Sequence, residues 1–116
     1  GNHKDLKLPQ LDFNLAEVDS IRIIACGTSY HAAMVAKYWL EFFAKVPVSV
    51  DIASEFRYRQ PPLTKHGLSI FISQSGETAD TIAALELAKD AGQKILSIVN
   101  VPESTIDRES HASLYT

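Results

Sequence analysis

Short apolar runs alternate along the chain with longer stretches that carry apolar residues at helical spacing. Residues 21–26 are a β-branched run that ends at Gly27, which is typical of a buried strand in a parallel sheet. Residues 30–45 then carry helix formers and aromatic residues without Gly or Pro, and Pro47 prevents the helix from continuing. The pattern therefore predicts a strand followed by a helix.

The rest of the chain repeats this alternation. Residues 48–52 alternate apolar and polar side chains, which predicts a shorter strand at an edge of the sheet. Further strands are predicted at residues 68–72, 95–99 and 112–115, and a second helix at residues 78–91. In that helix Ile82, Leu85 and Ala88 share one face, and Gly92 follows where a left-handed C-terminal cap is needed. The expected order is strand, helix, strand, strand, helix, strand, strand.

This alternation predicts the fold class. Strands that alternate with helices form an α/β three-layer sandwich around a parallel five-stranded sheet. Right-handed crossovers then place helices on both faces of the sheet. We expect residues 1–20 to be a lead-in segment and residues 21–116 to form one domain.

Composition and charge exclude several classes of function. The chain has 116 residues, 46% hydrophobic and 22% charged, which is sufficient for a single hydrophobic core. Its 11 Lys and Arg residues are scattered and are outnumbered by 14 Asp and Glu residues, so no nucleic-acid ligand is expected. No apolar run approaches the ~20 residues needed to span a bilayer. We therefore expect a soluble, cytoplasmic protein.

The sequence offers no motif for a cofactor or a metal. Cys26 is the single cysteine and cannot form an intramolecular disulfide, and the four histidines lie too far apart for a local zinc site. There is no Gly-x-Gly-x-x-Gly motif and no Gly-Lys-Ser/Thr motif, so neither dinucleotide nor P-loop nucleotide binding is expected. A hydrolase elbow is excluded because Ser73, rather than Gly, lies two residues before Ser75.

Two loops that follow predicted strands contain the candidate binding residues. The carboxyl ends of parallel strands lie at one edge of a sheet, where ligands bind in open α/β folds. Each loop contains one Gly for a tight turn and leads into a helix whose first free N–H groups carry partial positive charge. Their hydroxyl and amide side chains are those of Thr28, Ser29, Ser73, Gln74, Ser75 and Thr78. Such groups satisfy phosphate oxygens without Lys or Arg, so the loops predict a site for a phosphate with a hydroxylated body.

A second interpretation of these loops is helix capping. Ser29 and Ser75 would then be N-caps that stabilise their helices by about 1 kcal/mol each. Capping explains one such loop on its own. Two loops with this density of hydroxyls, at adjacent strand ends, favour a ligand.

Three motifs resemble those of one known family. They are Cys-Gly-Thr-Ser-Tyr at residues 26–30, Ala-Ser-Glu-Phe-Arg-Tyr-Arg at residues 53–59 and Ser-Gln-Ser-Gly-Glu-Thr at residues 73–78. From residue 21 to 116 the chain resembles the first sugar isomerase (SIS) domain of the isomerizing glutamine:fructose-6-phosphate aminotransferases. The resemblance implies a flavodoxin-like fold that binds a phosphorylated ketose or hexose. It also implies that Ser29, Ser73, Gln74, Ser75 and Thr78 bind the sugar phosphate, with Thr28 near the sugar body.

Enzymes of that family have a glutaminase domain followed by two SIS domains, form dimers, and make glucosamine 6-phosphate from fructose 6-phosphate and glutamine. Their glutaminase nucleophile is an N-terminal cysteine, whereas Cys26 lies inside this chain. Their isomerisation residues belong to the second SIS domain and the C-terminal tail. The resemblance therefore implies an excised first SIS domain that has no catalytic residue and is inactive alone, with the second SIS domain and the glutaminase domain as partners. The alternative is a non-enzymatic SIS module that senses a sugar phosphate for regulation.

For two further groups of residues the sequence allows two structural roles. Cys26 is either a reactive thiol at a helix N-terminus or a small packed residue at a strand end. Glu55, Arg57 and Arg59 either contact a partner subunit or form a solvated charged turn, and the two aromatic residues between them require burial.

The predicted helix at residues 30–45 carries more apolar surface than one sheet face can cover. Its polar stripe is formed by Lys37, Glu41 and Lys45, and the rest of its circumference is apolar. These apolar side chains are Met34, Val35, Tyr38, Trp39, Leu40, Phe42 and Phe43. They are covered either by the lead-in around Leu11, Phe13 and Leu15 or by a second copy of the chain. We expect a homodimer, because aromatic residues are typical of interface cores.

Overall fold

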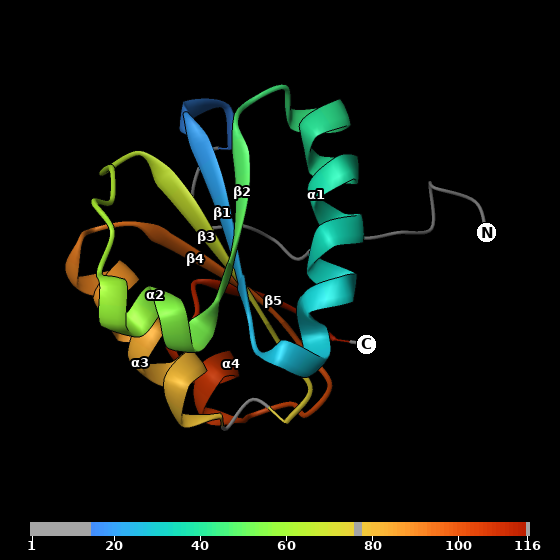
Figure 1. The fold of residues 1–116 in the computed structure, drawn as a ribbon, viewed down its shortest axis with the longest axis vertical. Helices are drawn as coiled ribbons and strands as arrows, with labels where there is room; N and C mark the ends of the chain where they lie inside the picture. Colours follow the sequence, from blue (N-terminus) through green and yellow to red (C-terminus); the bar gives the residue numbers. More distant parts are fainter. Residues whose placement is uncertain (1–14, 76–77, 116) are drawn as a thin grey trace.

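A five-stranded parallel sheet lies at the centre of the molecule (Figure 1). The computed structural model describes residues 15–75 and 78–115. Its strands are β1 (Ser20–Ala25), β2 (Val48–Ile52), β3 (Gly67–Ser73), β4 (Lys94–Val99) and β5 (Ala112–Tyr115), in the order β2-β1-β3-β4-β5. All four neighbouring pairs are parallel. The expected α/β class is confirmed, and β2 is an edge strand as predicted.

Helices cover both faces of the sheet. They are α1 (Tyr30–Ala44), α2 (Ala53–Arg59), α3 (Ala79–Asp90) and α4 (Thr105–Glu109), with short 3-10 turns η2 (Leu15–Glu17) and η3 (Gly27–Ser29). The chain steps from β1 to β2 in one direction and from β2 to β3, β4 and β5 in the other. Crossovers of a single hand therefore place α1 on one face and α2, α3 and α4 on the opposite face (Figure 1). No helix in the described ranges is long and apolar enough to cross a membrane.

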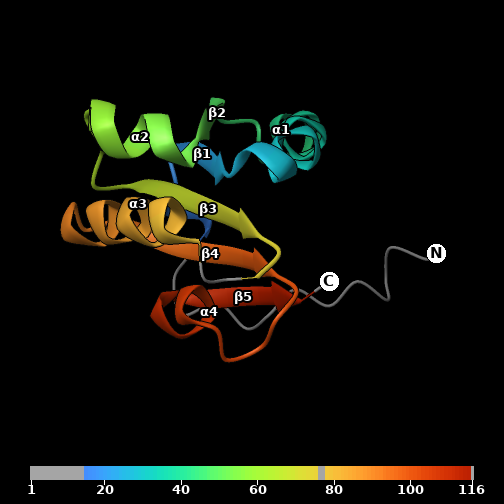
Figure 2. The ribbon, with the colours of Figure 1, turned by 60° about the horizontal axis from the view of Figure 1, so that its bottom comes forward.

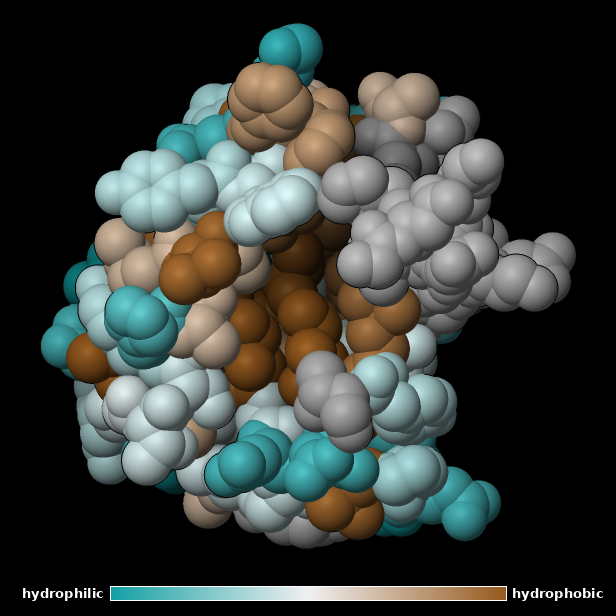
Figure 3. All heavy atoms as spheres, turned by 90° about the vertical axis from the view of Figure 1, so that its right-hand side faces the viewer, coloured by the Kyte–Doolittle hydropathy of each residue, from teal (hydrophilic) through white to brown (hydrophobic). Residues whose placement is uncertain are grey.

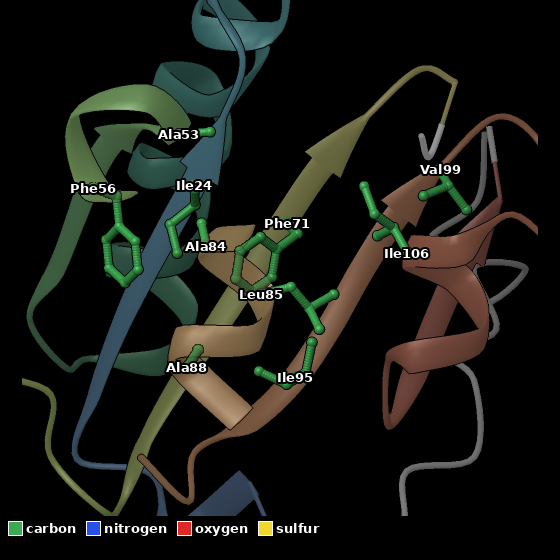
Figure 4. Packing of buried hydrophobic residues seen from close by; sticks show 10 residues of the cluster. All are labelled: Ile24, Ala53, Phe56, Phe71, Ala84, Leu85, Ala88, Ile95, Val99 and Ile106. Carbon is green, nitrogen blue, oxygen red and sulfur yellow. The ribbon is translucent and has the colours of Figure 1, made fainter. Parts of the chain in front are cut away.

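The main core lies between the sheet and helices α2, α3 and α4 (Figure 4). Phe71 of β3 packs there with Phe56 of α2 and Leu85 of α3, and all three are buried. Every residue of β3 is buried, as expected for a strand covered on both faces. The remaining members of this cluster are Ile24, Ala53, Ala84, Ala88, Ile95, Val99 and Ile106.

The opposite face is covered less completely. Ala33 is the one buried residue of α1, which packs on β1 and β2. Leu96 and Ile98 of β4 are only partly buried on this side of the sheet. Figure 3, viewed from the side on which α1 lies, shows apolar residues at the floor of a hollow in this face.

Helix α3 ends as the sequence predicts. Gly92 has a φ of 81°, the left-handed conformation that glycine adopts without a steric penalty. The N–H of Gly92 donates to the carbonyl of Lys89 at 2.9 Å, and that of Gln93 donates to the carbonyl of Ala88 at 3.1 Å. These two bonds are the Schellman pattern, which satisfies the last carbonyls of the helix.

The expected order of elements is incomplete, because residues 53–59 form helix α2 rather than a charged turn. Ala53 and Phe56 lie three positions apart and are both buried, so a single turn of helix directs them into the core. Tyr58 is 77% exposed, so the expected burial of both aromatic residues is wrong for this one. Seven residues are too few for helical periodicity to be recognised among four charged or polar side chains.

The expected order also lacks helix α4, which lies between β4 and β5. The Ser104 side chain caps this helix by accepting a hydrogen bond from the N–H of Asp107 at 3.4 Å. Ile106 is fully buried and anchors α4 against the sheet. Residues 1–14 of the predicted lead-in lie outside the described residues, and β1 begins one residue earlier than expected, at Ser20.

The contrast between Phe56 and Tyr58 gives a test of α2. Phe56→Ala removes a fully buried ring and should lower the free energy of unfolding by roughly 3–5 kcal/mol. Tyr58→Ala, on the same helix but exposed, should change it by less than about 0.5 kcal/mol. Urea denaturation followed by circular dichroism measures both. Equal losses in the two variants would contradict the packing of α2.

Candidate functional site

The two hydroxyl-rich loops leave neighbouring strands at the same edge of the sheet. In the parallel pair β1 and β3, Ala25 lies opposite Ile72. Cys26 therefore begins the first loop where β3 ends at Ser73. Figure 2 shows the arrowheads of β1, β3, β4 and β5 pointing to one edge.

This edge contains the point at which the strand order reverses. From β1 the chain crosses to β2 on one side through α1, and from β2 it crosses back to β3 through α2 on the opposite face. The loops that follow β1 and β3 thus lead to helices on opposite faces of the sheet. Ligands of open α/β sheets bind at such a switch point.

The first loop is a 3-10 turn in which hydroxyls surround a thiol. Cys26 Sγ lies 3.2 Å from Thr28 Oγ1 and 3.6 Å from Ser29 Oγ. The N–H of Ser29 donates to the carbonyl of Cys26 at 2.9 Å and closes the turn. Thr28 is exposed and Ser29 is half-buried.

Gly27 is not required for this turn, which corrects the expectation from sequence. Its φ is not positive, and a Cβ added there would meet nothing within 4 Å. The backbone could therefore carry a side chain. Because Gly27 has no side chain, there is open space next to Thr28, which is exposed.

The second loop combines buried and exposed polar groups. Ser73 is buried at the end of β3, whereas Gln74 and Ser75 are exposed. Thr78 is half-buried and immediately precedes α3. Gly76 and Glu77, which complete the motif, lie outside the described residues.

The residues at the N-cap positions of α1 and α3 do not cap these helices with their side chains. Ser29 is the N-cap residue of α1 and Thr78 that of α3, and neither side chain makes a capping hydrogen bond. Ser75 lies three residues before the N-cap position of α3 and is not its cap. The capping interpretation is therefore wrong for Ser29, and Ser75 does not occupy the N-cap position of α3.

A pair of charged residues at the start of α3 is not identified by sequence reasoning. Arg57 Nη1 donates to Asp80 Oδ1 at 2.9 Å, joining α2 to the first turn of α3. No local pattern connects two residues on separate helices, so only the packing of α2 against α3 reveals the pair. His31, the second residue of α1, is exposed beside the first loop.

The hydroxyls also act on the Cys26 thiol. Burial raises the pKa of Cys26, but hydrogen bonds with the side chains and backbone of Thr28 and Ser29 more than offset it. The pKa of the thiol therefore lies below the ordinary value for cysteine. Cys26 is half-buried, so it is neither a fully packed core residue nor a freely exposed thiol.

The parallel sheet, the helices on both faces and the two loops at the switch point define a doubly wound α/β domain with a candidate anion site at its carboxyl edge. The sequence profile of the SIS domain matches residues 14–116. The chain belongs to the SIS domain family.

Two proteins with similar sequences share a name. The chain is 57% identical to the isomerizing glutamine–fructose-6-phosphate aminotransferase of Zymomonas mobilis over 94% of its own length. It is 58% identical to the enzyme of that name from Bradyrhizobium diazoefficiens over 92% of its length. In both cases the match covers 18% of the relative, so the chain spans less than a fifth of these proteins.

Solved structures of related proteins have the same fold as this chain. The C-terminal domain of glucosamine-fructose-6-phosphate aminotransferase from Francisella tularensis superimposes with a TM-score of 0.83 at 48% identity, covering 88% of this chain and 29% of that one. Glucosamine-6-phosphate deaminase from Thermotoga maritima superimposes with a TM-score of 0.77 at 27% identity, covering 88% and 33%. The expected resemblance to the SIS domain of these aminotransferases is confirmed.

The Cys26 environment predicts a shifted pH profile of thiol alkylation. Because the pKa is lowered, the thiolate forms at lower pH, and alkylation by iodoacetamide should reach half its maximal rate below the pH expected for free cysteine. Thr28→Val keeps the shape but removes a hydroxyl 3.2 Å from Sγ, so its profile should move to higher pH. Thr64→Val, at the opposite edge of the sheet, is the control. A Thr28→Val profile that coincides with that of the unmodified chain would contradict the hydroxyl contact.

Proposed function

We propose that this chain binds fructose 6-phosphate as the first SIS domain of an isomerizing glutamine:fructose-6-phosphate aminotransferase. The observation that carries the proposal is the pairing of two hydroxyl-rich loops at the β1–β3 switch point. The N-cap residues of the two helices, Ser29 and Thr78, make no capping hydrogen bond with their side chains.

The chemistry of the loops suits a sugar phosphate. Ser29, Ser73, Gln74, Ser75 and Thr78 are the residues we assign to the phosphate, together with N–H groups at the starts of α1 and α3. Neutral donors at helix N-termini bind phosphate oxygens well, because the helix dipole favours negative charge. We assign Thr28 to the sugar body, since it is exposed next to the open space at Gly27.

The same residues argue against catalysis by this chain alone. None of the six side chains is a general acid or base near neutral pH, because hydroxyls and amides do not titrate there. The catalytic residues would then come from the second SIS domain, and ammonia from the glutaminase domain, of a longer cytoplasmic parent chain. The names of the relatives favour this enzyme over the alternative of a regulatory sensor.

We also propose that the chain forms a homodimer through α1. Six large side chains of this helix are exposed: Tyr30, Val35, Tyr38, Trp39, Phe42 and Phe43. Trp39 stacks on Phe43 with ring centroids 5.4 Å apart, and Phe42 meets Phe43 edge-on at 5.0 Å, so the aromatic residues form a preassembled patch. Lys37 and Glu41 flank it with opposite charges, which a twofold interface pairs reciprocally.

A ligand titration tests the phosphate site. Fructose 6-phosphate should shift the amide signals of residues 28–30 and 73–75 in NMR spectra, whereas free fructose at the same concentration should not. Ser75→Ala should weaken binding about tenfold, because hydrogen bonds to charged groups contribute roughly 1.5–3 kcal/mol. Ser49→Ala, on the edge strand β2, should bind as the unmodified chain does. Equal shifts with fructose and its phosphate would contradict phosphate recognition.

Sedimentation equilibrium tests the dimer. The unmodified chain should associate as its concentration rises, and Phe43→Glu, which places a charge at a 64% exposed position of the patch, should be monomeric over the same range. Tyr58→Glu makes the same kind of change on α2, on the opposite face, and should associate normally. A strictly monomeric unmodified chain at high concentration would refute the dimer.

A further inference from the structure

The first turn of α3 carries a carboxylate next to the proposed anion site. Asp80 is the second residue of the helix, and Thr78 is its N-cap. A carboxylate here stabilises the helix, because it lies near the positive end of the dipole. The same charge repels a phosphate dianion that approaches the N–H groups of this turn. Asp80 therefore stabilises the helix but weakens the binding of an anion at its N-terminus.

Arg57 meets this carboxylate from the neighbouring helix. Its Nη1 donates to Asp80 Oδ1 at 2.9 Å, and the two side chains are 43% and 38% exposed. The hydrogen bond with Asp80 raises the pKa of Arg57 further, although a guanidinium is already charged at neutral pH. Arg57 also lines a groove between α2 and α3 together with Glu86 and Asp90.

The pair is too exposed to contribute much to folding. Solvent-exposed ion pairs add little stability, because water screens them and two long side chains must be ordered. Helix α2 is already fixed by the buried side chains of Ala53 and Phe56. The main effect of Arg57 is therefore on the electrostatic potential at the start of α3.

We propose that Arg57 is a positioning residue of the sugar-phosphate site, which acts by neutralising Asp80 and holding its carboxylate toward α2. The inference rests on the proposed function, since it concerns the same site. The six candidate binding side chains carry no charge, so the ion pair between α2 and α3 contributes to the local charge that a dianion meets. Arg57 thus contributes to the preference for a phosphorylated ligand without touching it.

A double-mutant cycle tests this role. Fructose 6-phosphate affinity is measured by calorimetry for the unmodified chain, Arg57→Gln, Asp80→Asn and the double variant. Arg57→Gln exposes the uncompensated carboxylate and should weaken binding roughly fivefold. Asp80→Asn should bind at least as tightly as the unmodified chain, and the double variant should regain most of the affinity that Arg57→Gln loses.

Lys89→Gln is the matched control. Lys89 forms a similar exposed pair with Glu109, at 3.2 Å, near the opposite end of the same helix. The change removes one positive charge from the protein, as Arg57→Gln does, but about 15 Å from the first turn. Its affinity for fructose 6-phosphate should equal that of the unmodified chain.

Salt dependence separates an electrostatic role from a structural one. The loss in Arg57→Gln should be largest near 20 mM salt and should shrink severalfold near 500 mM, where the screening length falls to a few Å. A loss that does not vary with salt would overturn the inference, as would a double variant as weak as Arg57→Gln. Absence of binding to the unmodified chain would contradict the proposed function and this inference with it, whereas normal binding by Arg57→Gln would contradict the inference alone.

Discussion

The parallel pairing of β1 with β3 is the contact on which the candidate site depends. It brings together two loops that are separated in the chain by α1, β2 and α2, and it fixes their register, because Ala25 lies opposite Ile72. The pairing is stabilised by burial on both faces, since Ile23 and Ile24 of β1 and all residues of β3 are buried. A slip of one residue would exchange the faces of these side chains and displace the two loops from each other.

Much of this arrangement could be predicted from the sequence, because the strands and long helices have simple patterns. Apolar runs bounded by Gly and Pro identified all five strands to within a residue or two, and Gly92 gave the end of α3. Since parallel strands share a carboxyl edge, the position of the two loops followed from the order of elements. The excess of apolar residues on α1 was likewise evident from periodicity and is confirmed by their exposure.

What the sequence did not give depends on contacts between elements. Helices α2 and α4 are held by one or two buried residues each, Phe56 and Ile106 among them, and are too short to show a period. The ion pair of Arg57 with Asp80 exists because α2 packs on α3. The hydroxyl contacts of Cys26 depend on the 3-10 turn, which no motif of hydrophobic spacing reveals.

The separation of β1 from β3 along the chain also bears on folding kinetics. Their pairing requires closure of a loop that contains a helix, an edge strand and a second helix, and such non-local parallel pairs form slowly. During synthesis the hydroxyls after β1 leave the ribosome long before those after β3. A sugar phosphate could stabilise the chain by mass action only after β3 has docked between β1 and β4. A ligand bound as proposed would then stabilise the folded sheet without accelerating its formation.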